Sequence, residues 1–206
     1  AAGDNHPWIP RGINLPNADW IHEHHGSNSV NLGNIGRAAE QAEDVAADEF
    51  LLTDEEKERS REHYQLSREL LIDLHEVVGH GSGILNPGVL SARVSLKNYA
   101  ATLEEARADL VGLYFLLDEE LIRSGLMQNL ETGRAQYDRF ILNGQMLQLH
   151  RLALGLDLEE DHMRAEQLIT AWCFAQGASE GVILRTRQAE KTYFEIKDYS
   201  ALRGLF

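Results

Sequence analysis

The sequence contains little cysteine and no long apolar run. Cys173 is the single cysteine, which excludes a disulfide within the chain and a metal site built from several thiolates. A reducing, cytoplasmic compartment is therefore expected. The longest apolar run, 110–117, has eight residues, whereas a helix needs about 20 to cross a bilayer. We therefore expect no membrane partner.

Positive charge is scarce as well. Lysine and arginine number 19 against 33 aspartates and glutamates, which gives a net charge of -14. This surplus of negative charge opposes non-specific binding to nucleic acid, and no basic stretch with interleaved aromatics offsets it. Nucleic acid is therefore not an expected partner. What is present is an ordinary hydrophobic fraction of 43% over 206 residues, enough for one domain with a core.

The pattern of apolar residues predicts a mainly helical α+β domain that spans residues 1–206. Residues 1–36 are rich in Asn, Gly, His and Pro and are expected to be extended or looped. A capping box at 53–56 predicts the start of a long helix that ends at His80. Two segments near the C-terminus predict a short β-hairpin. One helix is expected to begin near residue 37, and the others are expected to cover 53–80, 103–123, 132–154 and 159–175. The expected strands cover 182–186 and 192–196.

The most informative segment is His75-Glu76-Val77-Val78-Gly79-His80, which has one residue more than the H-E-x-x-H motif of zinc peptidases. In H-E-x-x-H the histidines are four residues apart and share a helix face, and the glutamate lies beside the water on the metal. At a spacing of five, the two rings diverge by roughly 140° in a regular α-helix. Because Gly79 tolerates a bulge, we predict a distortion at 77–79 that brings His75 and His80 to one metal ion.

A catalytic zinc ion usually has three protein ligands and an open position for water, so a third ligand is needed. The best candidate is Glu105, which shares a helix face with Asp109. Beyond Asp109 the helix is apolar nearly all round, and buried carboxylates require a metal, another cation or hydrogen-bond donors. Glu104 and Asp109 would then accept hydrogen bonds from the free ring nitrogens of the ligand histidines. The alternative is a capping box in which Glu105 binds the backbone of Thr102.

These two motifs resemble those of the dipeptidyl-peptidase III family of zinc peptidases, H-E-x-x-G-H followed by E-E-C-R-A-E. The second motif departs from the family pattern at Ala106 and Asp109. The segment 11–17 is similar to the family's G-[IVL]-N-x-P-N segment, whose asparagines, here Asn14 and Asn17, bind the backbone of the bound peptide. By themselves these asparagines are typical of turns.

A third segment, 161–164, is similar to the family's x-H-M segment. The resemblance assigns His162 to stabilisation of the transition state, whereas the residue alone would be interpreted as a surface histidine of a helix. Glu76 is adjacent to a ligand histidine, and we expect it to act as the general base that takes a proton from the water and passes it to the leaving amine.

The resemblance implies a helical zinc-peptidase catalytic domain that binds one Zn²⁺ ion, although Co²⁺ or Mn²⁺ could occupy the same ligands. The implied activity is that of an exopeptidase that releases N-terminal dipeptides from short peptide substrates. The resemblance also implies that this chain is the metal-bearing lobe of a larger two-lobed enzyme, with the missing second lobe as a partner. Two alternatives stay open: a non-catalytic metal-binding module, and a helical interaction domain that binds no metal.

Overall fold

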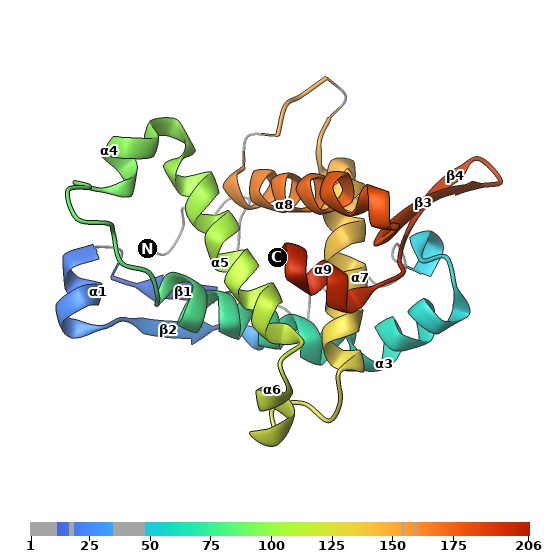
Figure 1. Ribbon diagram of the computed structural model, residues 1–206, viewed down its shortest axis with the longest axis horizontal. Coiled ribbons are helices and arrows are strands. Elements are labelled where there is room, and N and C mark those ends of the chain that lie inside the picture. The colour runs from blue at the N-terminus through green and yellow to red at the C-terminus, as the bar shows by residue number, and fades with distance from the viewer. Residues whose placement is uncertain (1–11, 17–18, 35–47, 154, 159) are drawn as a thin grey trace.

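The computed structural model describes residues 12–16, 19–34, 48–153, 155–158 and 160–206, which form a mainly helical fold with two small antiparallel sheets (Figure 1). The elements in chain order are β1 (Gly12–Leu15), α1 (Asp19–His25), β2 (Asn28–Asn31), α3 (Asp54–Asp73), the π-helix η1 (Leu74–His80), α4 (Ala92–Leu96), the 3-10 turn η2 (Lys97–Tyr99), α5 (Ala100–Leu116), α6 (Glu119–Arg123), α7 (Glu131–Gln145), the 3-10 turn η3 (Leu147–Arg151), α8 (Asp161–Gly177), the 3-10 turn η4 (Ala178–Glu180), β3 (Ile183–Gln188), β4 (Lys191–Ile196) and α9 (Tyr199–Leu205).

The hydrophobic core lies where α3, α5, α7 and α8 pack together. α3 packs along α7, and α5 contacts both η1 and α8. Leu113 of α5 and Tyr137 of α7 are completely buried in this core, and the Tyr137 hydroxyl donates a hydrogen bond of 2.6 Å to the Leu113 carbonyl. Cys173 of α8 belongs to the same core, and burial raises the pKa of its thiol to about 12. This cysteine is therefore a packing residue rather than a nucleophile.

The long helix begins where the sequence predicts. The Thr53 hydroxyl accepts a hydrogen bond from the Glu56 amide at 3.1 Å, and the Glu56 carboxylate accepts one from the Thr53 amide at 2.8 Å, so the capping box is confirmed. α3 continues directly into η1 at Leu74, whose amide bonds to carbonyls of the preceding turn. The wider π-turn absorbs the additional residue of the histidine motif.

Two glycines let η1 and α3 lie close to α5. A Cβ at Gly79 would lie 2.8 Å from the Cα of Ala108, and a Cβ at Gly112 would lie 2.9 Å from Cδ1 of Leu71. Both distances are shorter than the ordinary contact of about 3.5–4.0 Å between carbon atoms. The lack of side chains at these two positions therefore lets the histidine motif pack against the acidic motif of α5.

Each small sheet has two antiparallel strands. β1 pairs with β2, with Gly12 opposite Asn31 and Asn14 opposite Ser29, and both strands contact η1. β3 and β4 form the hairpin near the C-terminus and extend away from the helices (Figure 1). The mainly α fold with a C-terminal hairpin, expected from the sequence, is therefore confirmed.

Several predicted boundaries are wrong. The helix expected over 103–123 is divided into α5 and α6, because the Asp118 side chain accepts a hydrogen bond from the Glu120 amide and caps a new helix. The helix expected over 132–154 ends at Gln145 and is followed by η3. Helices α1, α4 and α9 are missing from the prediction, because helices of five to seven residues are too short to show a helical period.

The helix expected from about residue 37 falls within 35–47, outside the described residues. α1 also lies in the part of the chain that was expected to be only extended or looped. Within the described ranges, no helix is long and apolar enough to cross a membrane.

Candidate metal centre

The π-helix η1 brings the two histidines of the motif together. All seven residues from Leu74 to His80 belong to it, so the predicted distortion is present and extends beyond 77–79. The ring centroids of His75 and His80 are 4.6 Å apart, and their Nε2 atoms are 3.0 Å apart. Histidines five residues apart thus face a common point, which a regular α-helix does not allow.

Glu105 of α5 completes a triangle with these two rings. Its Oε2 atom lies 3.2 Å from Nε2 of His75 and 3.4 Å from Nε2 of His80. Ligands about 2.0–2.2 Å from a tetrahedral zinc ion are about 3.3–3.6 Å from one another, so these atoms are spaced almost as zinc ligands are. Oε2 is buried and, among the residues that the structure describes, has no properly directed hydrogen-bond donor. The three side chains therefore fit a metal ion.

The outer ring nitrogens of the two histidines face carboxylates. Nδ1 of His75 lies 2.8 Å from Asp109 Oδ1, and Nδ1 of His80 lies 3.1 Å from Glu104 Oε1. Arg107 in turn donates to Glu104. Carboxylates at these positions orient the rings so that both Nε2 atoms point at the metal position. The structure places Glu104 and Asp109 as the sequence predicts, and their role in metal binding remains a prediction.

The same contacts make the surroundings of the rings favourable for positive charge. Burial opposes protonation, yet contacts with Asp109 and Glu105 raise the pKa of His75 to about 10. Contacts with Glu104 and Glu105 likewise outweigh burial and raise the pKa of His80 to about 9. A divalent cation would meet the same carboxylates and would displace protons from the rings on binding.

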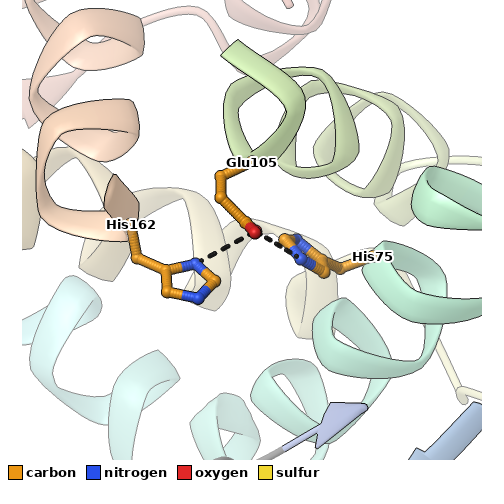
Figure 2. Close-up of side chains that lie close together, drawn as sticks. All are labelled: His75, Glu105 and His162. Carbon is orange, nitrogen blue, oxygen red and sulfur yellow. Dashed lines mark ion pairs between the residues drawn. The ribbon is translucent and has the colours of Figure 1, made fainter. Parts of the chain in front are cut away.

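His162 of α8 approaches the same glutamate from the opposite side. Figure 2 shows His75 and His162 on two sides of Glu105, each joined to it by an ion pair. Nδ1 of His162 lies 3.2 Å from Glu105 Oε2, and its side chain is 58% exposed. The ligand atoms of His75, Glu105 and His162 all lie within 4.8 Å of one another, so these residues form a second possible ligand set. We call His75, His80, Glu105 and His162 the histidine cluster.

The two ligand sets differ in how their histidines are held. His75 and His80 lie on one element, are mostly buried, and each has a carboxylate at its outer nitrogen. His162 is the most exposed member of the cluster and turns Nδ1 towards Glu105. The first set therefore resembles an oriented metal site more closely, and His162 lies where a ligand from solvent could reach it.

Glu76 interacts electrostatically with the residues of the histidine cluster, and its side chain lies against Gly12 of β1. Its side chain is buried, and burial raises the pKa of its carboxyl group, although His75 and His80 pull in the opposite direction. A carboxyl group with a raised pKa holds a proton more readily than an exposed one, as a general base near neutral pH requires. The structure thus places Glu76 where its predicted role could be carried out.

The capping alternative for Glu105 is wrong. α5 begins at Ala100, so Thr102 lies inside its first turn rather than at its N-cap. The Thr102 hydroxyl donates to Asp161 at the start of α8, and the Glu105 carboxylate faces the histidines instead. The sequence reasoning missed this link between α5 and α8, because a contact between residues 59 positions apart has no local signature.

Asn14 is buried at the edge of the site. Its Nδ2 lies 3.0 Å from the Glu76 carbonyl oxygen and 2.8 Å from Ser29 Oγ. Its Oδ1 is buried without a hydrogen-bond partner among the described residues. Asn17, the other predicted peptide-binding residue, lies outside the described residues. The contact of Asn14 with Glu76 was not predicted, and no single-sequence signal could have indicated it.

Comparison with known proteins relates the chain to a family of peptidases. The model of peptidase family M49 matches residues 6–87. Dipeptidyl peptidase 3 of Nematostella vectensis is 29% identical over 143 residues, which cover 56% of this chain and 19% of that protein. Dipeptidyl peptidase 3 of Homo sapiens is 29% identical over 146 residues, with 55% and 19% covered. The chain thus spans about a fifth of the length of these relatives.

The fold is also similar to a solved structure. DPP III from Caldithrix abyssi superposes with a TM-score of 0.67 over 95% of this chain and 35% of the other, at 20% sequence identity. This comparison shows a shared fold. Together with the relatives, it confirms the resemblance to the dipeptidyl-peptidase III family that the two motifs indicate.

Proposed function

We propose that this chain is the metal-bearing part of a zinc-dependent exopeptidase that releases N-terminal dipeptides from short peptides. One observation carries the proposal: His75 Nε2, His80 Nε2 and Glu105 Oε2 converge with separations of 3.0–3.4 Å, and the buried Glu76 is close enough to interact electrostatically with all three residues. The similarity to dipeptidyl peptidases named above supports the reaction and the substrate class. Because the chain spans about a fifth of those relatives, the activity of the whole protein is part of the proposal.

His75, His80 and Glu105 would hold the ion. Two imidazole nitrogens and one carboxylate oxygen form a donor set that zinc peptidases use, although Co²⁺ and Mn²⁺ accept the same atoms. When bound, Zn²⁺ would polarise the scissile carbonyl and lower the pKa of water towards about 7. Asp109 and Glu104 would keep the ring nitrogens directed at the ion.

Glu76 would move the proton. Its carboxylate accepts a proton as the water oxygen forms a bond to the scissile carbon, and it delivers that proton to the amine nitrogen as the carbon–nitrogen bond breaks. Burial supports this role because it raises the pKa of the carboxyl group. His162 would donate from its ring to the oxyanion, and its exposed position beside Glu105 is open to an approaching peptide.

Hydrolysis of matched peptides tests the proposal. Wild-type protein is expected to release dipeptides from peptides with a free N-terminus and to leave N-terminally blocked peptides uncut, and a chelator should abolish the reaction. Glu76→Ala should lower kcat by at least about 10²-fold, because a general base contributes about 10²–10⁴-fold, while bound metal stays unchanged. Glu58→Ala, an exposed glutamate of α3, is the matched control and should behave as wild type.

The same experiment separates the alternatives. Equal cleavage of free and blocked peptides would contradict dipeptide release. Bound metal without hydrolysis of any peptide would favour a non-catalytic metal-binding module. Less than about half an equivalent of transition metal would favour an interaction domain without metal, because a three-ligand zinc site retains its ion during purification.

A further inference from the structure

Strand β1 lies directly against the residue that would act as the base. A Cβ placed on Gly12 of β1 would lie 2.5 Å from Oε1 and 2.8 Å from Cγ of Glu76. Ordinary contacts between such atoms are about 3.5 Å. As long as the Glu76 side chain keeps this position, only glycine fits at residue 12, so the strand sets a limit on how the carboxylate can turn.

The same strand also contacts the backbone of Glu76. Asn14 is 5% exposed, and its Nδ2 donates to the Glu76 carbonyl oxygen at 3.0 Å. Ser27 and Ser29 hold the amide in place, with hydroxyl oxygens 2.9 and 2.8 Å from the same nitrogen. Because a π-helix is a rare conformation, a buried donor from outside the helix helps to fix the turn from which the Glu76 side chain extends.

We infer that β1 positions the Glu76 carboxylate, with Gly12 limiting its orientation and Asn14 anchoring its backbone. The inference rests on the proposed function, because the position of a base matters only where Glu76 transfers protons. It gives Asn14 a role beyond the peptide contact that the family resemblance assigns, since Nδ2 is engaged within the protein. Gly12 and Asn14 are positioning residues and act through Glu76.

The position of a base has a large effect on rate. A general base must come within about 2.6–3.2 Å of the atom that carries the proton, and a misplacement of about 1 Å can cost about 10²-fold. A methyl group at residue 12 would have to move away from Glu76 by about 1 Å to reach an ordinary contact. The carboxylate or the strand must therefore shift by that amount.

Gly12→Ala tests the inference in the metal-loaded chain. It is expected to lower kcat by about 10²-fold with unchanged KM and one equivalent of metal. Val30→Ala in the paired strand is the control, because Val30 is half exposed and its truncation should leave kcat within twofold of wild type. A Gly12→Ala variant with wild-type kcat would overturn the inference.

Asn14→Asp provides a second test should Gly12→Ala fail to fold. Aspartate keeps the size of the side chain and an acceptor oxygen but lacks the N–H that binds the Glu76 carbonyl. A tenfold change in rate corresponds to about 1.4 kcal/mol, which is within the range for the loss of one buried hydrogen bond, here the bond to the Glu76 carbonyl. A fall in kcat of about tenfold or more at constant KM would therefore support positioning. A rise in KM at constant kcat would assign Asn14 to substrate contact alone and overturn its positioning role.

A crystal structure of Gly12→Ala separates this inference from the proposed function. If the wild type hydrolyses no peptide, the proposed function fails, while the geometry can still be judged. A displacement of the Glu76 carboxylate by about 1 Å relative to the wild type supports the inference. If the Glu76 carboxylate keeps its position, strand β1 has moved instead, and that result would overturn the inference.

Discussion

The histidine cluster and a second cluster around the buried Arg59 both bring ionisable side chains together, and they differ in the source of their positive charge. In the second cluster, Arg59 donates to Glu131 at 2.8 Å, to Asp138 at 2.7 Å and to Glu55 at 2.9 Å. The Tyr199 hydroxyl donates to Asp138 at 2.7 Å and accepts from Arg59 at 2.8 Å. We call these five residues the arginine cluster. It contains its own cation.

Among the described residues, no arginine or lysine lies at the centre of the histidine cluster. Its positive charge comes instead from the imidazoles, whose raised pKa values favour protonation when no metal ion is bound. Oε2 of Glu105 faces three ring nitrogens at 3.2–3.4 Å, yet it is buried without a properly directed donor among the described residues. Arg107 binds Glu104 at the edge of the cluster rather than Glu105. A buried carboxylate that is paired with an arginine of the same protein contributes to the stability of the fold. A buried carboxylate that faces only imidazole nitrogens can instead bind a cation from solution.

The largest expected effect comes from removing the cation of the arginine cluster. At pH 8, Arg59→Met should lower the free energy of unfolding by about 3–5 kcal/mol, because the buried Asp138 carboxylate loses its opposite charge and keeps only the hydrogen bond from Tyr199. The exposed neighbour Arg61 provides the control, since Arg61→Met should stay within about 0.5 kcal/mol of wild type. Denaturant unfolding of the chelated proteins gives both values. A loss below about 1 kcal/mol for Arg59→Met would show that the arginine cluster does not stabilise the fold.

The next effect concerns metal affinity. Asp109→Asn removes the carboxylate at the outer nitrogen of His75 and should weaken metal binding by about 10–100-fold, with Asp54→Asn on the exposed first turn of α3 as control. Competition with a chromogenic chelator measures the affinity. Equal affinity of Asp109→Asn and wild type would mean that Asp109 does not orient a ligand.

The smallest effect per step of the experiment is expected from pH, because it is spread over several pH units. Burial raises the pKa of Asp138 to about 7, against the opposing pull of Arg59 and Tyr199, from an ordinary value of 3.8. The folded state therefore holds this proton more tightly than the unfolded state. The contribution to stability is complete below about pH 4 and is lost as the pH rises to about 7, with a slope of at most about 1.4 kcal/mol per pH unit.

Asp138→Asn isolates this contribution, because the amide does not titrate. The free energy of unfolding of the wild type should fall relative to that of Asp138→Asn between pH 5 and pH 7, measured by denaturant unfolding at each pH. A constant difference between the two proteins over this range would mean that Asp138 has an ordinary pKa in the folded state.

The parts of the fold that could be predicted have local signals. The capping box at Thr53, the additional residue of the histidine motif and the alternating C-terminal strands are each visible within a few residues of sequence. The carboxylates at Glu104 and Asp109 could be placed because they share a helix with Glu105. The boundary between α5 and α6 was missed, because the cap at Asp118 interrupts a pattern of apolar residues that continues past it.

Contacts between distant residues could not be predicted from one sequence. Asn14 meets the Glu76 carbonyl across 62 residues, and Arg59 meets Asp138 across 79. In both cases a common polar residue has many possible partners, and only the packing of the helices selects one. The family resemblance pointed to His162, but its approach to Glu105 from α8 depends on how α5 and α8 cross.

The metal content of protein purified without added metal tests most directly whether the open carboxylate of the histidine cluster marks a metal site. Elemental analysis should find about one equivalent of transition metal in the wild type and in His63→Ala, a histidine of α3 outside the cluster. His80→Ala should lose the ion, whereas His162→Ala should retain it. Less than about half an equivalent in the wild type, or retention of the ion by His80→Ala, would contradict the assignment of His75, His80 and Glu105 as the ligands.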